Sequence, residues 1–425
     1  MLDIKFVREN PDAVKQDLKK RKDAEKLGWV DDLVKSEAEY RQLLQENQKL
    51  RQRRNEITDE INQLKKQNKD ISEKIKEVKE IPQKVKESDY KVESLKDKVH
   101  NYLMRIPNIL DDDVPSGKDS DDNLVVRECG KIKKPKFELL PHGELLEKHG
   151  FADFIKAGEV SGNGFYYLMG DAALMELALI NFATEHLIKK GFTLVEPPLM
   201  LRRKPYEGVT DLADFETMMY KIDGEDLFLI ATSEHPIGAL HMNETFEERE
   251  LPKKYAGISP CFRREVGSRS IDTKGIFRVH HFNKIEQFVF CRPEDSKKIH
   301  EELISNAETL FQKLKLPYRI VNICTGDIGT VAAKKYDLEV WMPRENIYRE
   351  AVSCSNCTSY QAVRLNIKYK KGEDKHYVHT LNSTAIATGR ALRAIIENYQ
   401  QKDGTIKVPS VLQKYIGKKS IGSKS

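Results

Sequence analysis

The chain has few cysteines and no long apolar run. Its six cysteines stand at irregular positions, unlike the disulfide framework of a small secreted domain. The first ten residues, MLDIKFVREN, lack the apolar stretch that directs export. The most apolar run, 172–188, is interrupted by Glu176, Asn181 and Glu185, so it does not fit a membrane span. We therefore expect a reduced, cytoplasmic protein without a membrane segment.

The sequence also lacks two familiar catalytic signatures and a strong charge bias. It shows no P-loop for nucleotide phosphates and no Ser-His-Asp set, so nucleotide chemistry here needs another arrangement. The 72 basic and 67 acidic residues leave a net charge of +5, which permits a nucleic-acid partner only where basic residues cluster. With 425 residues, the chain is long enough for two or three domains.

Glycine is missing between residues 31 and 105, where Lys, Glu, Gln and Leu dominate. Apolar residues recur there every seven positions, which is typical of a coiled coil. They form two sets: Leu43, Leu50, Ile57, Leu64, Ile71 and Val78, followed by Val85, Val92, Val99 and Ile106. We therefore expect two long helices that pack against each other.

Two positions compete for the corner between these helices. A corner at Pro82 makes the first helix roughly twice as long as the second and leaves half of its apolar seam uncovered. A corner at 67–70 gives two arms of roughly 36 residues, each about 50 to 55 Å long at 1.5 Å per residue. Asp70 and Glu73 then form a helix-capping pattern. We favour 67–70, with Pro82 kinking the returning helix.

After the helices the composition changes again. Residues 106–120 are rich in Asp, Pro and Gly without periodicity, as in a linker. Beyond them, helical runs alternate with short β-rich runs, at 172–189, 296–313 and 385–400 and at 193–195, 227–230 and 318–321 respectively. We expect an α+β protein with an antiparallel helical hairpin (1–107), a linker (108–125), a catalytic domain with an antiparallel sheet flanked by helices (126–416) and a disordered tail (417–425).

Residues 261–288 predict a β-hairpin with a long tip, because two apolar flanks enclose the turn-forming residues 267–275. Residues two apart on a strand share a face: Arg263 with Glu265 on the first strand, and Arg278, His280 and Phe282 on the second. A guanidinium can fork onto a phosphate, a carboxylate can accept from an amine, and a phenyl ring can stack on a purine. Arg263 and Glu265 alone fit better a half-exposed hairpin with cross-strand ion pairs.

Taken together, residues 261–288 resemble motif 2 of the class II aminoacyl-tRNA synthetases, with Arg-x-Glu, a loop and Arg-x-x-x-Phe. Residues 190–198, a Gly-Phe after a helix and then two prolines, resemble motif 1, which builds the dimer interface in that class. Residues 379–390, with Arg390 near the start of a helix, resemble motif 3. The resemblance implies a homodimer that uses ATP with Mg²⁺.

Thr232, Ser233 and Glu234 match the Thr-Ser-Glu signature of the seryl-tRNA synthetases. Further stretches agree in order and spacing from the helical hairpin to motif 3, and the resemblance is to the archaeal or eukaryotic type. It implies a ligase that activates L-serine to seryl-adenylate and transfers it to the 3′ end of tRNA(Ser). The sequence leaves open whether tRNA(Sec) is also charged.

The resemblance also implies the roles of individual residues. ATP is expected to contact eight of them: Arg263, Arg264, Glu265, Val279, Phe282, Glu350, Ser353 and Arg390. Serine is expected to contact seven: Thr232, Ser233, Glu234, Arg263, Glu286, Asn382 and Thr384. Arg263, Glu265 and Arg390 are the catalytic candidates, for the α-phosphate, the adenine amine and the γ-phosphate, and Glu350 is the candidate Mg²⁺ ligand. Phe282 would stack on adenine. The chemistry needs no side-chain nucleophile, because the serine carboxylate itself attacks the α-phosphorus.

The same resemblance implies that the helical hairpin binds tRNA by shape and by phosphate contacts. Its candidate contacts are basic residues of the tip and of the first arm: Arg51, Arg53, Arg54, Lys65, Lys66 and Lys69. Such residues also occur on any solvated helix surface.

Three positions depart from the family pattern. Val352 replaces a usual hydroxyl, which puts one ATP or ribose contact in doubt, and His281 replaces a usual glutamine in motif 2. The motif 2 loop, 268–273, lacks the usual glycines, which bears on how it meets the acceptor end of tRNA.

A zinc site is one alternative reading of this region. Cys354, Cys357, His376 and His379 form a C-x2-C and H-x2-H pattern, but the spacing between the pairs exceeds that of a usual finger. Both pairs lie in or beside stretches that the family uses without metal, so we expect no structural zinc.

Two alternative functions also remain at this stage. One is an inactive paralogue that retains the fold as a binding protein, and the other is an amino-acid:carrier-protein ligase on the same core. The intact Arg263, Glu265, Glu286 and Arg390 count against the first, and the helical hairpin counts against the second.

Overall fold

The computed structural model describes residues 1–211, 217–265 and 274–422. It divides into two compact units, Met1–Pro107 and Asn108–Ser425. Within the described residues, no helix combines the length and the apolar composition needed to cross a membrane. The predicted motif 2 loop at 268–273 lies outside the described residues.

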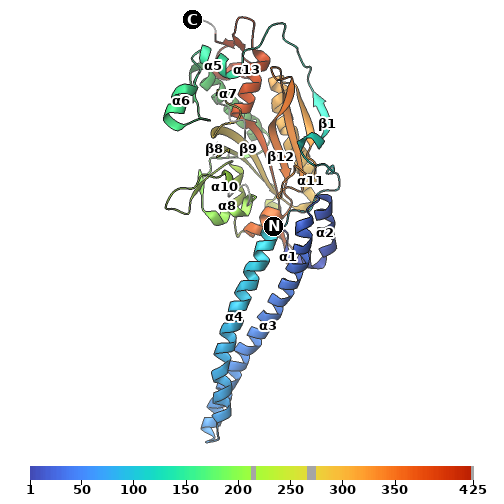
Figure 1. Ribbon diagram of the computed structural model, residues 1–425, viewed down its shortest axis with the longest axis vertical. Helices are drawn as coiled ribbons and strands as arrows, with labels where there is room; N and C mark the ends of the chain where they lie inside the picture. Colours follow the sequence, from blue (N-terminus) through green and yellow to red (C-terminus); the bar gives the residue numbers. More distant parts are fainter. Residues whose placement is uncertain (212–216, 266–273, 423–425) are drawn as a thin grey trace. The chain divides into compact units, whose positions relative to one another are not determined.

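The first unit consists of four helices (Figure 1). They are α1 (Ile4–Glu9), α2 (Pro11–Lys20), α3 (Ala24–Lys66) and α4 (Ser72–Arg105). The predicted corner at 67–70 is confirmed, because α3 ends at Lys66 and α4 begins at Ser72. Asp70 precedes Ile71, the N-cap residue of α4, and accepts from the backbone N–H of Ser72 at 2.9 Å, in place of the expected capping pattern with Glu73. Pro82 lies inside α4.

The two long helices hold each other through apolar and polar contacts. Ile57 and Ile81 of the heptad region are buried, and most other heptad positions are half-buried, as expected where only two helices share a seam. The Asn47 amide donates to Asp89 at 2.7 Å across the two arms. Arg51 pairs with the same Asp89 at 2.9 Å. The arms are unequal, 43 and 34 residues, because α3 begins before the coiled-coil region.

Two of the basic residues expected to meet tRNA instead bridge the helices. Arg51 pairs with Asp89 at 2.9 Å and Arg53 with Glu77 at 2.9 Å. The other four side chains are exposed and have no ion-pair partner among the described residues: Arg54, Lys65, Lys66 and Lys69.

The second unit is built on an eight-stranded sheet. In spatial order the strands are β1 (Leu124–Cys129), β10 (Tyr318–Asn322), β11 (Lys334–Met342), β12 (Ile347–Asn356), β15 (His379–Ala387), β9 (His281–Cys291), β8 (Lys253–Phe262) and β4 (Thr193–Val195). All neighbours are antiparallel except β4 and β8, which are parallel. The predicted antiparallel sheet is therefore confirmed, with one parallel edge strand.

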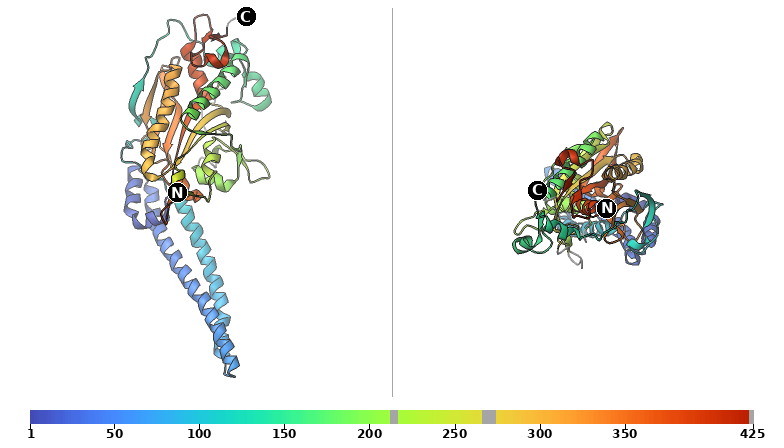
Figure 2. Two further views of the ribbon diagram at one scale, coloured as in Figure 1. Left: turned by 180° about the vertical axis from the view of Figure 1, so that it is seen from behind. Right: turned by 90° about the horizontal axis from the view of Figure 1, so that it is seen from above.

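Three helices cover one face of this sheet: α7 (Gly170–Lys189), α11 (Ser296–Leu314) and α13 (Thr388–Tyr399). Figure 2 shows α11 lying along the strands. The predicted helix at 385–400 began three residues too early, because β15 continues to Ala387 and packs its apolar side chains into the core before the backbone turns helical. Pairing of Ile386 with Ile285 and of Ala387 with Lys284 on β9 keeps that stretch in the sheet.

Smaller elements surround the sheet. The helices are α5 (His142–Lys148), α6 (Phe154–Ser161), α8 (Arg203–Val209), α10 (Glu234–Ala239), α12 (Tyr360–Leu365) and α14 (Gln413–Ile416). The short strands pair as β2 (Ala152–Asp153) with β3 (Tyr167–Leu168), β5 (Met200–Leu201) with β6 (Phe228–Leu229), and β16 (Ile406–Lys407) with β17 (Ser420–Ile421). A three-stranded sheet has the order β14 (Asp374–Tyr377), β13 (Lys368–Lys371), β7 (Thr245–Glu247).

Two segments expected to be irregular take part in the second unit. In the expected tail, 417–425, Ile421 is buried and β17 pairs with β16, while 423–425 lie outside the described residues. The expected linker, 108–125, begins with a buried residue, Asn108, whose amide donates to the carbonyls of Val331 (3.0 Å) and Cys357 (2.8 Å). Composition indicated loops but could not reveal these distant partners.

Removing the Asn108 amide should destabilise the second unit. We expect Asn108→Ala to lower the free energy of unfolding by about 2 to 4 kcal/mol, because a buried amide that donates to the Val331 and Cys357 carbonyls is lost. Urea unfolding followed by fluorescence measures the change. The exposed Asn163 offers a control, since Asn163→Ala should change stability by less than about 0.5 kcal/mol. Equal effects of the two substitutions would contradict this account of Asn108.

Candidate active site

A cavity of about 650 Å³ opens on the face of the sheet opposite the three helices. One face of the sheet is apolar and the other polar, because successive side chains along a strand point to opposite faces. On β9, Ile285 packs into the helical core, whereas Lys284 and Glu286 line the cavity. On β15, Leu381 joins the core, whereas Asn382 and Thr384 line the cavity. The polar residues of these central strands therefore converge on one side.

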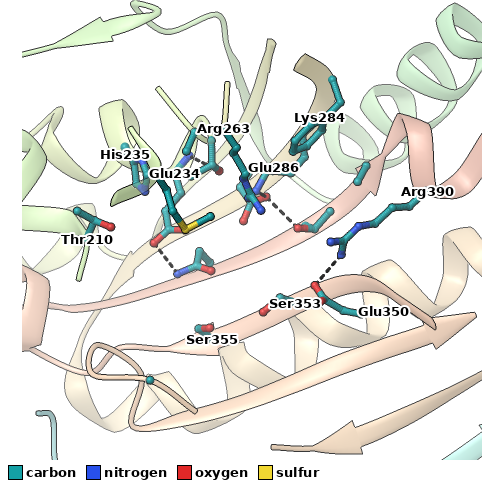
Figure 3. A pocket seen from close by; sticks show the side chains of 18 of the residues that line it. Thr210, Glu234, His235, Arg263, Lys284, Glu286, Glu350, Ser353, Ser355 and Arg390 are labelled. Atoms are coloured by element: carbon teal, nitrogen blue, oxygen red, sulfur yellow. Dashed lines mark hydrogen bonds and ion pairs between the residues drawn. The ribbon is translucent and has the colours of Figure 1, made fainter. Parts of the chain in front are cut away.

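One end of the cavity contains two carboxylates, the half-buried Glu234 and the buried Glu286 (Figure 3). Glu286 is 1% exposed and pairs with Lys284 at 2.7 Å. The Thr384 hydroxyl donates to the same carboxylate at 3.2 Å. Burial raises the pKa of Glu286 above its ordinary value, and Lys284 opposes that rise. This end is suited to a small cationic, hydroxyl-bearing ligand, because carboxylates accept from both groups.

Glu234 stands at the start of α10 and accepts two amide hydrogen bonds. Gln361 donates to its Oε1 atom at 3.1 Å and Asn382 at 3.0 Å. Burial, and then repulsion from Glu286, raise the pKa of Glu234 to about 7. The two carboxylates therefore differ, because Glu286 has a lysine beside it and Glu234 has neutral amides.

Arginines occupy the rest of the cavity. Arg263 lies between the two carboxylates in Figure 3, with its guanidinium 5.3 Å from the centre of the Phe282 ring. Arg390 donates to Glu350 at 2.7 Å and lies 5.4 Å from the ring of Phe277. Arg390 holds the pKa of Glu350 down, at about 2, so this carboxylate stays ionised at neutral pH. Two guanidiniums facing one cavity are suited to phosphate groups.

The hairpin differs from its expected geometry. Strand β8 ends at Phe262 and β9 begins at His281, so Arg263, Glu265 and Arg278 lie beyond the strands. Arg263 continues the pairing by donating its N–H to the His280 carbonyl at 2.9 Å. Glu265 has φ of +47°, so the predicted same-face argument for Arg263 and Glu265 was wrong. Glu265 instead pairs with Arg278 at 2.8 Å, a cross-strand ion pair of the kind the simpler reading allowed.

Most of the predicted site residues come together in this cavity. Those that line it are Thr232, Glu234, Arg263, Glu265, Val279, Phe282, Glu286, Glu350, Ser353, Asn382, Thr384 and Arg390. Ser233 and Arg264 do not line it. Ser233 is fully buried and donates to the Gly257 carbonyl at 3.4 Å, and the Arg264 backbone donates to Met218.

Val352 does not remove a hydroxyl from the cavity. It pairs with Leu338 of β11 and packs in the helical core, whereas Ser353 and Ser355 on the same strand line the cavity. The doubt that the sequence raised about an ATP contact at Val352 therefore does not apply to this geometry.

The structure adds residues that sequence reasoning did not assign. Lys284 was two positions from Glu286 on a strand, and this spacing could have indicated the ion pair. Gln361, Ser355 and Phe277 had no such signal, because their partners are distant in the sequence.

The four residues of the zinc pattern have separate partners, and the ring of His376 lies 5.6 Å from that of Tyr369. The Cys354 thiol lies 3.8 Å from the His300 carbonyl, and Asn382 donates to the Cys357 sulfur at 3.7 Å. His379 contacts the Ser296 hydroxyl at 3.0 Å. Among residues 1–211, 217–265 and 274–422, no three His, Cys, Asp or Glu side chains gather as a metal site.

Comparison with known proteins agrees with the site and with the helical unit. Residues 1–110 match the seryl-tRNA synthetase N-terminal domain, and residues 216–399 match the tRNA synthetase class II core domain (G, H, P, S and T). A serine–tRNA ligase of Methanocella arvoryzae is 60% identical over 98% of this chain and 99% of its own length. That of Pyrococcus abyssi is 51% identical over 99% and 97%.

Solved structures give the same result. The seryl-tRNA synthetase from Pyrococcus horikoshii, complexed with ATP, has a TM-score of 0.94 and 49% identity, and the match covers all of both chains. The cytoplasmic serine–tRNA ligase from Naegleria fowleri, in complex with AMP, has a TM-score of 0.89 and 35% identity over 100% of this chain and 99% of its own. By sequence and by fold, over almost its whole length, the chain belongs to the seryl-tRNA synthetase family.

Proposed function

We propose that this protein is a serine–tRNA ligase, which activates L-serine with ATP and transfers the seryl group to the 3′ end of tRNA(Ser). The observation that carries the proposal is a single cavity with two carboxylates, one of them buried, at one end and two arginines beyond them. The carboxylates suit the ammonium group of an amino acid, and the arginines suit the phosphates of a nucleoside triphosphate beside it. Relatives named serine–tRNA ligase, at 50 to 60% identity, support the same activity.

In the first step the serine carboxylate attacks the α-phosphorus of ATP and pyrophosphate leaves. Glu234 and Glu286 hold the ammonium and hydroxyl of serine, with Thr232, Asn382 and Thr384 completing the pocket. Arg263 meets the α-phosphate and stabilises the charge that develops there. The protein thus acts by positioning and by charge stabilisation.

The nucleotide extends from Arg263 toward Arg390 in this proposal. Phe282 stacks on the adenine, Glu265 and the backbone at Val279 contact its edge, and Arg390 holds the γ-phosphate. Because Arg390 donates to Glu350 at 2.7 Å, phosphate binding exchanges this ion pair for a phosphate contact. When the nucleotide binds, the adenine amine likewise replaces part of the ion pair between Glu265 and Arg278.

Magnesium fits the oxygen donors beside the phosphate site. The ionised carboxylate of Glu350 and the hydroxyl of Ser353 both line the cavity, and hard cations prefer such ligands. When bound with ATP, Mg²⁺ supplies positive charge that neutralises the phosphates. Glu350 and Ser353 would hold it at the ATP end.

The first unit, residues 1–107, serves in the proposal as the tRNA-binding arm, and residues from about 126 onward form the catalytic domain. The exposed Arg54, Lys65, Lys66 and Lys69 provide the phosphate contacts, because their side chains are not engaged in ion pairs among the described residues. A cytoplasmic location, where tRNA is charged, belongs to the same proposal.

A homodimer is also part of the proposal. Motif 1 here is α7 and β4, and both elements carry exposed apolar side chains. They are Leu174, Leu177, Ile188 and Leu194, each between 42% and 55% exposed. A second copy of the chain that covers this face would remove them from water.

Serine binding should depend on pH through Glu234. Its pKa is raised to about 7, so lowering the pH from 8 to 6 changes it from mostly ionised to mostly protonated. A protonated carboxyl attracts the serine ammonium less, so we expect the KM for serine to rise about five- to tenfold at saturating ATP. Glu234→Gln should flatten this dependence. A KM that stays constant between pH 8 and pH 6 in the unmodified protein would contradict the role of Glu234.

Amino-acid-dependent ATP–pyrophosphate exchange tests the proposed activation. Serine should support exchange, whereas alanine and glycine, which lack a hydroxyl, leave buried acceptors unpaired and should support it at least about a hundredfold less well. Threonine tests the size of the pocket. Equal exchange with all four amino acids would overturn the specificity for serine, and no exchange with serine would favour a binding protein that retains the fold.

A further inference from the structure

Gln361 of α12 lies directly behind the carboxylate of Glu234. It is fully buried, and its Nε2 atom donates to the Val209 carbonyl at 2.8 Å and to Glu234 Oε1 at 3.1 Å. The hydroxyl of Thr380, also fully buried, donates to Gln361 Oε1 at 2.7 Å. Every polar group of the Gln361 side chain therefore has a partner, and one of those partners is the carboxylate proposed to meet serine.

These contacts fix the orientation of the Gln361 amide. If the amide were flipped, its oxygen would face the Val209 carbonyl and the Glu234 carboxylate, so that acceptors would meet acceptors without a proton between them. The Thr380 hydroxyl would also face an NH₂ group in place of an oxygen. A buried amide with one allowed orientation is a rigid donor, and it directs its second N–H at Glu234.

The two amides on Glu234 act on the same oxygen. Gln361 and Asn382 both donate to Oε1, whereas Oε2 has no hydrogen-bond partner in the described part of the chain. Glu234 lines the cavity, so Oε2 is the oxygen left for a ligand. The carboxylate plane is set by donors behind it, and its remaining lone pairs are available in front.

We infer that Gln361 is a positioning residue for the amino-acid substrate: its amide, oriented by Thr380, turns Glu234 so that Oε2 faces serine. The inference rests on the proposed activation of serine and adds a residue that touches neither substrate. Gln361 does not line the cavity, so its influence on serine passes through Glu234.

The effect of Gln361 on Glu234 can be measured through the pH dependence of serine binding, because charged groups surround Glu234. Lys284 and Glu286 face it from β9, Arg263 follows β8, and the neighbouring His235 of α10 is buried beside it. The hydrogen bond from Gln361 favours the ionised carboxylate against burial and against Glu286. Without this donor the pKa of Glu234 rises further, so serine binding weakens at a higher pH.

The chain provides a matched control in Gln287. This glutamine is also fully buried, donates to the Leu303 carbonyl at 3.1 Å and accepts from Asn306 at 2.9 Å, but it faces the helical core. Gln361→Met and Gln287→Met therefore remove the same buried amide from the two opposite faces of the sheet. Both should lower the melting temperature, whereas only the first should affect serine.

Exchange kinetics separate the two roles. For Gln361→Met we expect the KM for serine to rise about tenfold at pH 8, the KM for ATP to stay within about twofold, and the pH dependence of the serine KM to move to higher pH. Gln287→Met should leave both KM values within about twofold. If Gln361→Met leaves the serine KM unchanged, or raises the two KM values equally, the inference is wrong.

Thr380→Val provides a second variant if Gln361→Met does not fold. It keeps the shape of Thr380 but releases the Gln361 amide, and it should raise the serine KM about threefold without changing that for ATP. No change in a folded Thr380→Val protein would count against the orientation step. Serine-dependent exchange by the unmodified protein is the reference: its absence would refute the proposed function, whereas its presence with unaffected variants would refute only the role of Gln361.

Discussion

Shortening the helical arm should abolish tRNA charging while leaving serine activation intact. Asn47 and Asp89 touch across the two helices at 2.7 Å, so residues 48–88 can be replaced by a short Gly-Ser linker between adjacent ends. The shortened protein lacks Arg54 and the three lysines of the tip, and with them the phosphate contacts that tRNA binding would use. Serylation of tRNA(Ser) should fall by at least about a thousandfold, and serine-dependent exchange should stay within about twofold.

A milder variant separates charge from shape in this arm. Replacing Lys65, Lys66 and Lys69 by glutamine keeps the helices but removes three positive charges, so tRNA affinity should weaken and its dependence on salt should flatten. Arg51→Gln and Arg53→Gln are useful comparisons, because these residues bridge the helices and should affect the stability of the arm instead. Unchanged tRNA charging by the shortened protein would show that the arm is not required for tRNA binding.

Replacing Arg263 by alanine should produce the largest loss in the activation step. Its guanidinium lies 5.3 Å from the centre of the Phe282 ring, in the cavity that Glu234 and Glu286 also line, and in the proposal it meets both the serine carboxylate and the α-phosphate. Removing a preorganised donor to developing charge typically costs about a hundred- to a thousandfold in rate. We therefore expect kcat/KM in serine-dependent exchange to fall about a thousandfold.

Arg263→Lys tests whether the forked shape of the guanidinium matters. Lysine keeps the charge but cannot donate two parallel hydrogen bonds, so about a tenfold loss is expected. Arg292→Ala controls for the loss of an arginine near the same hairpin, because Arg292 pairs with Asp295 at 2.8 Å outside the cavity. If Arg263→Ala kept more than a tenth of the activity, Arg263 would not have the proposed role.

The sequence predicted the parts of the fold that depend on local periodicity. The heptads of the arm, the corner before Asp70 and strand β4 appear where their patterns indicated. These features arise from the pitch of a helix and the pleat of a strand, which act over a few residues.

The features that could not be predicted depend on contacts between residues that are distant in the sequence. Strand β17 pairs with β16. The buried Asn108 donates to the carbonyls of Val331 and Cys357, which are more than 200 positions away in the sequence. Glu265 leaves the strand geometry at a positive φ, which no pattern of apolar residues indicates. Gln361 stands 127 positions from Glu234, and only the folded chain brings its amide to that carboxylate.

Charging of tRNA(Ser) with labelled serine tests the central claim most directly. The purified protein, ATP, Mg²⁺, serine and a tRNA(Ser) transcript should yield serine esterified to the 3′-terminal ribose, released by mild base. A transcript with an oxidised 3′ end should accept none. If serine is activated but appears on a carrier protein and not on tRNA, or if no serine is activated at all, the account of this protein as a serine–tRNA ligase is wrong.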